Sequence, residues 1–167
     1  LLTDRAKVFT DTPLPGDNAV AARALLKLYL LTSEDRWRSL VDETLASFAG
    51  AAAGRATFAA TYAMAAEAHL HKPPQTVVIG PRRDPRTAEL AHAAWRTYRP
   101  GRLVAIYDPT TVVLDSLPEA VAGAARVFRS DPTPRAYVCV GETCAPPTTD
   151  PAAVADLVRT YGLRGGG

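Results

Sequence analysis

The sequence changes its pattern at Lys72-Pro73-Pro74-Gln75-Thr76-Val77-Val78-Ile79-Gly80. The two prolines end the preceding helical pattern, because proline lacks the N–H group that a helix interior needs. A short apolar run follows and stops at glycine, which is typical of a buried strand. The stretch therefore predicts an α/β protein in two parts: a helical segment over residues 1–74 and a small α/β domain over residues 75–164.

Upstream of this boundary the sequence predicts three helices. The first has only two charged side chains, Arg23 and Lys27, and apolar side chains cover the rest of its circumference. Such a helix is expected to be buried on several sides, whereas the second helix has one polar face and forms an antiparallel hairpin with the first. Three such helices do not close a core, so we expect them to belong to a larger helical array. They are predicted at residues 18–31, 34–48 and 56–69.

Downstream of the boundary, short apolar strands alternate with helical stretches. Continuous apolar strands between helices predict a small, mostly parallel sheet with helices on both faces. Trp95 and Tyr98 are expected to pack in the core, and residues 165–167 to form a flexible tail. The strands are predicted at residues 77–79, 103–107, 112–114 and 136–140, and the helices at 84–98, 118–127 and 150–161.

Composition excludes several classes of protein. The 167 residues carry a formal net charge of +2, from 19 Lys and Arg against 17 Asp and Glu, so strong attraction to nucleic acid is not expected. The chain is 47% hydrophobic, which excludes a disordered chain, and no apolar run approaches the ~20 residues that cross a bilayer. Two cysteines that look free and no visible signal peptide favour the cytoplasm. Three histidines leave little for a metal cage, and no metal or cofactor is predicted.

Polar residues before the first helix are candidate ligand contacts. Asp11, Asp17 and Asn18 either cap the helix, which needs only one of them, or line a cavity. Capping and a cavity-lining role both stay open here.

Two further groups of residues are candidate sites. Cys139 and Cys144 have four residues between them, which is neither the spacing of a thioredoxin-like redox pair nor that of a zinc knuckle. Cys139 is expected to be buried and Cys144 more exposed, either as inert or structural thiols or as a reversible disulfide. Arg82 and Arg83 follow a strand and precede a helix, where an anion can bind, although arginines in a solvated loop are also common.

Three segments, residues 12–22, 74–80 and 136–150, together resemble one family. Their order and spacing are similar to the C-terminal end of the large thioredoxin-domain-containing proteins, relatives of the spermatogenesis-associated thioredoxin-like protein. Members of this family begin with a thioredoxin-like domain and continue into an α/α toroid similar to N-acylglucosamine epimerases and six-hairpin glycosidases. Two departures are visible: Pro15-Gly16-Asp17-Asn18 replaces the usual Pro-Ser-Gly-Asn, and no thioredoxin-like domain is present in this sequence.

The resemblance implies that residues 1–74 supply closing helices of the toroid. The partner would then be the remainder of a longer chain, which agrees with a sequence that begins at Leu1 without an initiator methionine. Any cavity ligand would be carbohydrate-like, with Asp11, Asp17 and Asn18 as candidate contacts. The alternative is a thiol-redox or protein-interaction module that uses Cys139 and Cys144. Whether the protein is an enzyme stays open.

Overall fold

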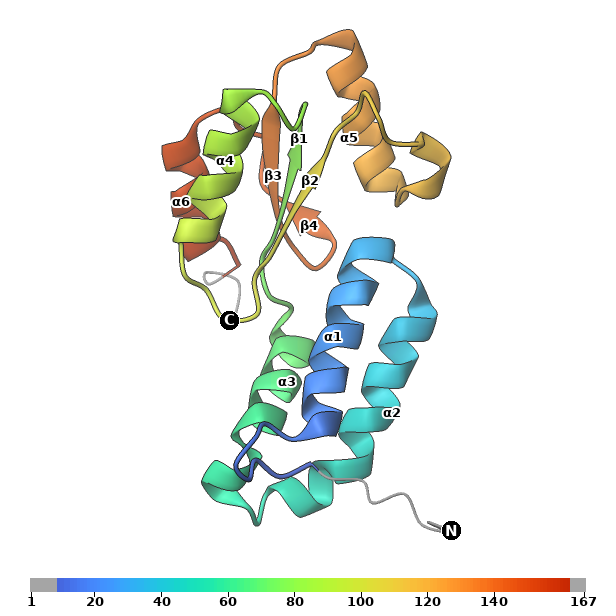
Figure 1. The fold of residues 1–167 in the computed structure, drawn as a ribbon, viewed down its shortest axis with the longest axis vertical. Helices are drawn as coiled ribbons and strands as arrows, with labels where there is room; N and C mark the ends of the chain where they lie inside the picture. The colour runs from blue at the N-terminus through green and yellow to red at the C-terminus, as the bar shows by residue number, and fades with distance from the viewer. Residues whose placement is uncertain (1–8, 163–167) are drawn as a thin grey trace. The chain divides into compact units, whose positions relative to one another are not determined.

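The computed structural model describes residues 9–162 and divides the chain into two compact units (Figure 1). The first, Leu1–His71, is the helical unit, and the second, Lys72–Gly167, is the α/β unit. The division falls beside the proline pair that marks the boundary in the sequence. The predicted tail at residues 165–167 lies outside the described residues. Within residues 9–162, no helix combines the length and the apolar character needed to cross a membrane.

The helical unit is built from α1 (Asp17–Thr32), α2 (Asp35–Ala52), the short 3₁₀ helix η1 (Ala56–Ala59) and α3 (Ala60–His71). All three α-helices contribute to one core, which is small because half of its buried members are alanine. The core residues are Ala22, Leu26, Val41, Leu45, Ala65 and Ala68.

The helix α1 is less buried than its composition predicts. Its buried side chains are Ala19, Ala22 and Leu26, whereas Val20 and Leu28 are 46% and 39% exposed. The expectation that this helix is buried on several sides is therefore not met by the chain itself. The reason is that only α2 and α3 pack against it within the helical unit, so a second apolar side of α1 has no helix to cover it.

A segment before α1, residues 9–16, forms a strap across the ends of the helices. The ring of Phe9 stacks on that of Phe48 of α2, with centroids 5.0 Å apart, and meets the edge of the Tyr62 ring of α3 at 6.4 Å. Gly16, at the other end of the strap, lies so close to Phe9 that an added Cβ would be 2.3 Å from the Phe9 carbonyl oxygen. Gly16 is also the N-cap of α1, without a side-chain cap, so the expected capping by Asp17 or Asn18 is wrong.

The α/β unit contains a four-stranded sheet in the order β2-β1-β3-β4. β1 and β2 are parallel, whereas β3 is antiparallel to both β1 and β4, so the prediction of a mostly parallel sheet is wrong. Apolar runs mark where strands lie but carry no information about their direction. The elements are β1 (Gln75–Ile79), α4 (Pro85–Arg96), β2 (Leu103–Tyr107), η2 (Leu114–Ser116), α5 (Glu119–Ser130), β3 (Arg135–Val140), β4 (Thr143–Cys144) and α6 (Pro151–Thr160).

Predicted element boundaries are largely confirmed in this unit. The strand at residues 103–107 is confirmed, and both Asp-Pro helix starts are confirmed because Asp84 and Asp150 accept hydrogen bonds from backbone N–H groups of the first turns of α4 and α6. The predicted strand at residues 112–114 is wrong. That segment belongs to the connection between β2 and α5, which contains η2.

The core of the α/β unit has two clusters, because successive side chains of a strand point to opposite faces. Val78 of β1 and Val138 of β3 cluster with side chains of α4 and α6. Val77 and Ile79 of β1 cluster with Val121 and Phe128 of α5. Figure 1 shows α4 and α6 on one side of the strands and α5 on the other.

Trp95 and Tyr98 do not pack in the core, which corrects the sequence expectation. Trp95 is 46% exposed and Tyr98 is 76% exposed. The buried face of α4 is made by smaller side chains, among them Leu90 and Ala94. Trp95 follows Ala94 and is therefore turned about 100° around the helix from it, given 3.6 residues per turn. Tyr98 lies beyond the last residue of α4.

Candidate functional site

Asp11 lies in the strap and holds it to two helices through its carboxylate. Oδ1 accepts a hydrogen bond from the backbone N–H of Gly16 at 2.7 Å, and Oδ2 accepts one from the backbone N–H of Thr61 at 2.8 Å. Thr61 lies in the first turn of α3, where N–H groups lack partners within the helix. The backbone N–H of Asp11 donates to the carbonyl of Phe58 at 2.8 Å. Both carboxylate oxygens are therefore engaged inside the helical unit.

The charge of Asp11 is stabilised by these contacts. Its pKa is lowered from 3.8 because the backbone N–H groups of Thr61 and Gly16 donate to the ionised carboxylate. Asp17 is exposed in the first turn of α1, where a negative charge is favourable, and Asn18 is half-buried beside it. Of the three candidate ligand contacts, Asp11 thus has a structural role, since each of its oxygens accepts a backbone N–H.

Arg82 and Arg83, the candidate anion contacts, lie in the turn between β1 and α4, and both are exposed. The Arg82 guanidinium donates from Nη2 to the carbonyl of Ile106 at 3.3 Å. Within residues 9–162, the side chain of Arg83 has no recorded partner. The turn also requires Gly80, since an added Cβ would be 2.4 Å from Oγ1 of the buried Thr87.

The N-terminus of α4 already holds a carboxylate. Oδ1 of Asp84 accepts a hydrogen bond from the backbone N–H of Arg86 at 2.9 Å, and Oδ2 lies 2.8 Å from Nη2 of the same arginine. The side-chain hydrogen bond from Arg86 is the main reason that the pKa of Asp84 is lowered. An external anion at this helix end would compete with Asp84, which weighs against the predicted anion site.

Asp108 is a polar residue that the sequence interpretation missed. It follows β2, is 9% exposed, and its Oδ2 accepts a hydrogen bond from the backbone N–H of Arg82 at 3.0 Å. Its Oδ1 accepts from the N–H and the hydroxyl of Thr110 at 3.0 and 2.6 Å. The Thr110 hydroxyl and the Arg82 N–H lower its pKa. The sequence did contain a signal for this role. An aspartate that follows a strand and precedes Pro-Thr typically accepts hydrogen bonds from the backbone of its own turn.

Asp108 also occupies the edge at which open α/β sheets most often bind ligands. β1 and β2 are adjacent and parallel, and the helices that follow them, α4 and α5, belong to different core clusters. Ligands bind outside the carboxyl ends of such strands. Here the Asp108 carboxylate joins the two loops that follow β1 and β2, through the backbone N–H of Arg82 and through Thr110.

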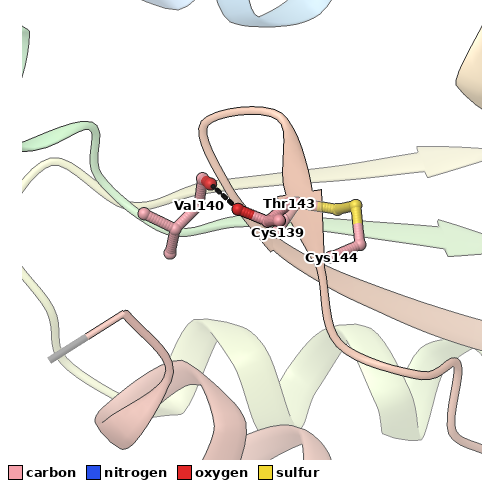
Figure 2. The surroundings of a disulfide bond; sticks show 4 residues. All are labelled: Cys139, Val140, Thr143 and Cys144. Atoms are coloured by element: carbon pink, nitrogen blue, oxygen red, sulfur yellow. Dashed lines mark hydrogen bonds between the residues drawn. A yellow bond between two sulfur atoms is a disulfide. The ribbon is translucent and has the colours of Figure 1, made fainter. Parts of the chain in front are cut away.

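Cys139 and Cys144 form a disulfide bond, with an S–S distance of 2.00 Å, so of the two alternatives that the sequence left open the structure has the disulfide and not the free thiols. Figure 2 shows the bond crossing the hairpin between β3 and β4. The two cysteines are direct partners in the antiparallel register, next to the pair Val140 and Thr143. The paired cysteines also remove one of the two arguments that favoured the cytoplasm.

The hairpin explains why these two cysteines meet. Gly141 and Glu142 form the turn, and Gly141 has φ +60°, a conformation that glycine adopts readily at the first position of a two-residue hairpin turn. Cys139 and Cys144 are placed symmetrically about this turn. As expected, Cys139 is buried, at 8% exposed, and Cys144 is exposed.

The candidate residues are divided between the two units. Asp11, Asp17 and Asn18 belong to the helical unit, whereas both arginines and both cysteines belong to the α/β unit. Within residues 9–162, no group of three or more His, Cys, Asp or Glu side chains is placed to hold a metal ion. Comparison of the chain with protein-family models, with curated proteins and with solved structures finds no match. Function is therefore argued from the geometry of the two units.

The Asp11 contacts predict a pH-dependent loss of stability. Asp11→Asn removes the charge that the two N–H groups stabilise, so we expect a lower free energy of unfolding at neutral pH. The pKa of Asp11 is lower in the folded chain than its ordinary value of 3.8. The stabilisation by the Asp11 charge is therefore fully present at pH values well above 3.8, and it is lost as the pH falls through the lower pKa of the folded chain. Urea unfolding, followed by Trp37 fluorescence in a Trp95→Phe background, measures the difference at each pH.

Asp17→Asn is the matched control, since Asp17 is exposed six residues further along the same segment. We expect the Asp11→Asn difference to shrink below about pH 4, and Asp17→Asn to have a smaller effect at neutral pH. Equal effects of the two variants, or a difference that does not change with pH, would contradict the structural role of Asp11.

Proposed function

We propose that this chain is the C-terminal part of a thioredoxin-domain-containing protein and acts as an interaction module. Its helical unit would add helices to a larger α/α array, similar to the toroid of six-hairpin glycosidases, formed with the remainder of a longer chain. The observation that carries this proposal is the set of large apolar side chains left exposed on all three helices. These are Val20 and Leu28 of α1, Leu40 of α2, and Met64 and Leu70 of α3.

The distribution of these side chains supports a helical partner. Leu40 of α2 is 42% exposed and Met64 of α3 is 49% exposed, so the exposure is not confined to one helix. Single exposed apolar residues are normal on a protein surface, but here each of the three α-helices of one small unit carries at least one. A helix that is apolar on more than one side needs neighbours on more than one side. Further helices of the same array would supply them.

A carbohydrate-like ligand in such a toroid is the finer part of the proposal. Asp11, Asp17 and Asn18 are the candidate contacts, and the carboxylate of Asp11 is held in a fixed position by backbone N–H groups. Titration of the chain with a panel of sugars, followed by the amide shifts of residues 11–18, tests this part. The residues encoded before Leu1 test the family assignment, which requires a thioredoxin-like segment and more helical hairpins there.

The exposed apolar side chains predict binding of a hydrophobic dye. We expect the chain to enhance the fluorescence of anilinonaphthalene sulfonate, and the triple variant Leu28→Gln, Leu40→Gln and Met64→Gln to lose most of that signal. Because these side chains are far from fully buried, the variant should keep its helical circular dichroism. Sedimentation velocity on both proteins shows whether the unmodified chain self-associates and whether the triple variant does so less.

The control variant carries Val113→Gln and Val127→Gln, which replace exposed apolar side chains of the α/β unit that are 67% and 51% exposed. It should bind the dye as the unmodified chain does. Absence of dye binding by the unmodified chain, or an equal loss in the control, would remove the support for a helical partner.

A second candidate function is thiol–disulfide exchange at Cys139 and Cys144, favoured by the observed bond and by the exposure of Cys144. A thiolate of an external dithiol attacks the Cys144 sulfur, the S–S bond breaks, and Cys139 leaves as a thiolate that takes up a proton. The second thiol of the dithiol then attacks the mixed disulfide and releases Cys144. The chain gains two electrons and two protons, and the dithiol is oxidised to its disulfide.

If the bond exchanges, the number of free thiols in the chain should rise from zero to two as the ratio of dithiol to disulfide in the buffer rises, and the chain should stay folded. The bond closes a short loop, so its opening should lower the free energy of unfolding by only about 2 kcal/mol. Each single variant leaves one free cysteine. The Cys144 thiol that remains in Cys139→Ser should react with glutathione disulfide faster than the Cys139 thiol that remains in Cys144→Ser, because Cys139 is buried. A bond that stays closed in excess dithiol under native conditions would exclude this function.

A further inference from the structure

The α/β unit carries an exposed group of aromatic and cationic side chains at the end of α4. Trp95 and Tyr98 are exposed, and the ring of His92, also exposed, lies 5.8 Å from that of Trp95. The guanidinium of Arg102 lies 5.8 Å from the centre of the Tyr98 ring, and its Nη2 donates to the carbonyl of Trp95 at 2.7 Å. We name His92, Trp95, Tyr98 and Arg102 the aromatic patch.

The backbone under the patch is held in place. The backbone N–H of Arg102 donates to the carbonyl of Arg99 across Pro100 and Gly101, and Gly101 has φ +70°, as a turn with proline then glycine at its centre requires. Arg99 is fixed in turn, because its Nη1 donates to three carbonyls at the end of α6, the nearest being that of Tyr161 at 2.8 Å. The backbone between Tyr98 and Arg102 is therefore already ordered before a partner binds.

Two arginines at the patch have no carboxylate partner. Arg96 follows Trp95 in the chain, Arg102 belongs to the patch, and within residues 9–162 neither forms an ion pair with a carboxylate. Arg99 differs, because its guanidinium is already held by carbonyls at the end of α6. Arg86 and Arg126 of the same unit, by contrast, pair with acidic side chains at 2.8 Å. A partner that brings carboxylates to this surface would supply the missing charge.

We propose that the aromatic patch binds an acidic peptide segment of a partner protein. An apolar side chain of the peptide packs on Trp95 and Tyr98, and its carboxylates pair with Arg96 and Arg102. Trp, Tyr and Arg are the residues that contribute most to protein interfaces, and a guanidinium offers two parallel donors to one carboxylate. Nucleic acid is the less favoured occupant, because the net charge of the whole chain is only +2.

The proposal is tested on the intact ¹⁵N-labelled chain with a short synthetic peptide in which glutamate alternates with leucine. We expect the peptide to shift the amide signals of residues 92–102, with affinity falling as salt is raised. Tyr98→Ala and Arg102→Gln should each weaken binding at least about fivefold. Arg83→Gln is the matched control, an exposed arginine of the same unit outside the patch, and should bind the peptide normally.

Two further probes separate the alternatives. The same peptide with glutamine in place of glutamate should bind more weakly, and a mixed-sequence single-stranded oligonucleotide should leave residues 92–102 unshifted. The proposal is overturned if the glutamate peptide leaves the patch unshifted, if the two patch variants bind it as well as Arg83→Gln does, or if only the oligonucleotide binds. Tyr98 is 76% exposed, so its replacement leaves the fold intact, and the amide spectrum checks this directly.

Discussion

The helical unit has a core too small for the apolar surface of its helices. The three helices share one cluster of six buried residues, and three of these are alanine, which allows close packing but buries little area. The strap adds Phe9 to this core, and the Asp11 carboxylate holds it there through backbone N–H groups. Large apolar side chains stay exposed on α1, α2 and α3. They are the basis for proposing that further helices complete the array. The α/β unit has two clusters of buried residues, one with side chains of α4 and α6 and one with side chains of α5.

Much of the fold could be predicted from the sequence. The proline pair marked the boundary, and the Asp-Pro pairs marked the starts of α4 and α6, because each depends on the local chemistry of a few residues. The direction of β3 could not be predicted, since an apolar run looks the same in either orientation. The hairpin was treated as a loop, although Cys139 and Cys144 stand symmetrically about Gly141 and Glu142, and this symmetry was the available signal for the disulfide.

The candidate sites show a common pattern. Asp11, Asp84 and Asp108 all accept hydrogen bonds from backbone N–H groups, so their carboxylates hold loops and helix ends together. Sequence alone does not separate a carboxylate that binds a ligand from one that binds backbone. Trp95 and Tyr98 were misplaced for a related reason, because the composition of α4 does not fix which side of the helix faces the sheet. Their exposure, next to unpaired arginines, leads to the proposed peptide site.

The small core of the helical unit is tested most directly by native-state hydrogen exchange on the intact chain. Amides that exchange only by cooperative opening report the stability of their own unit. The account predicts that the most protected amides of α1 and α2, near Leu26 and Leu45, open at a lower free energy than those of β1 and β3, near Val78 and Val138. Equal or greater protection in the helices would contradict it, because a unit that lacks neighbours would not match the stability of one that encloses its core.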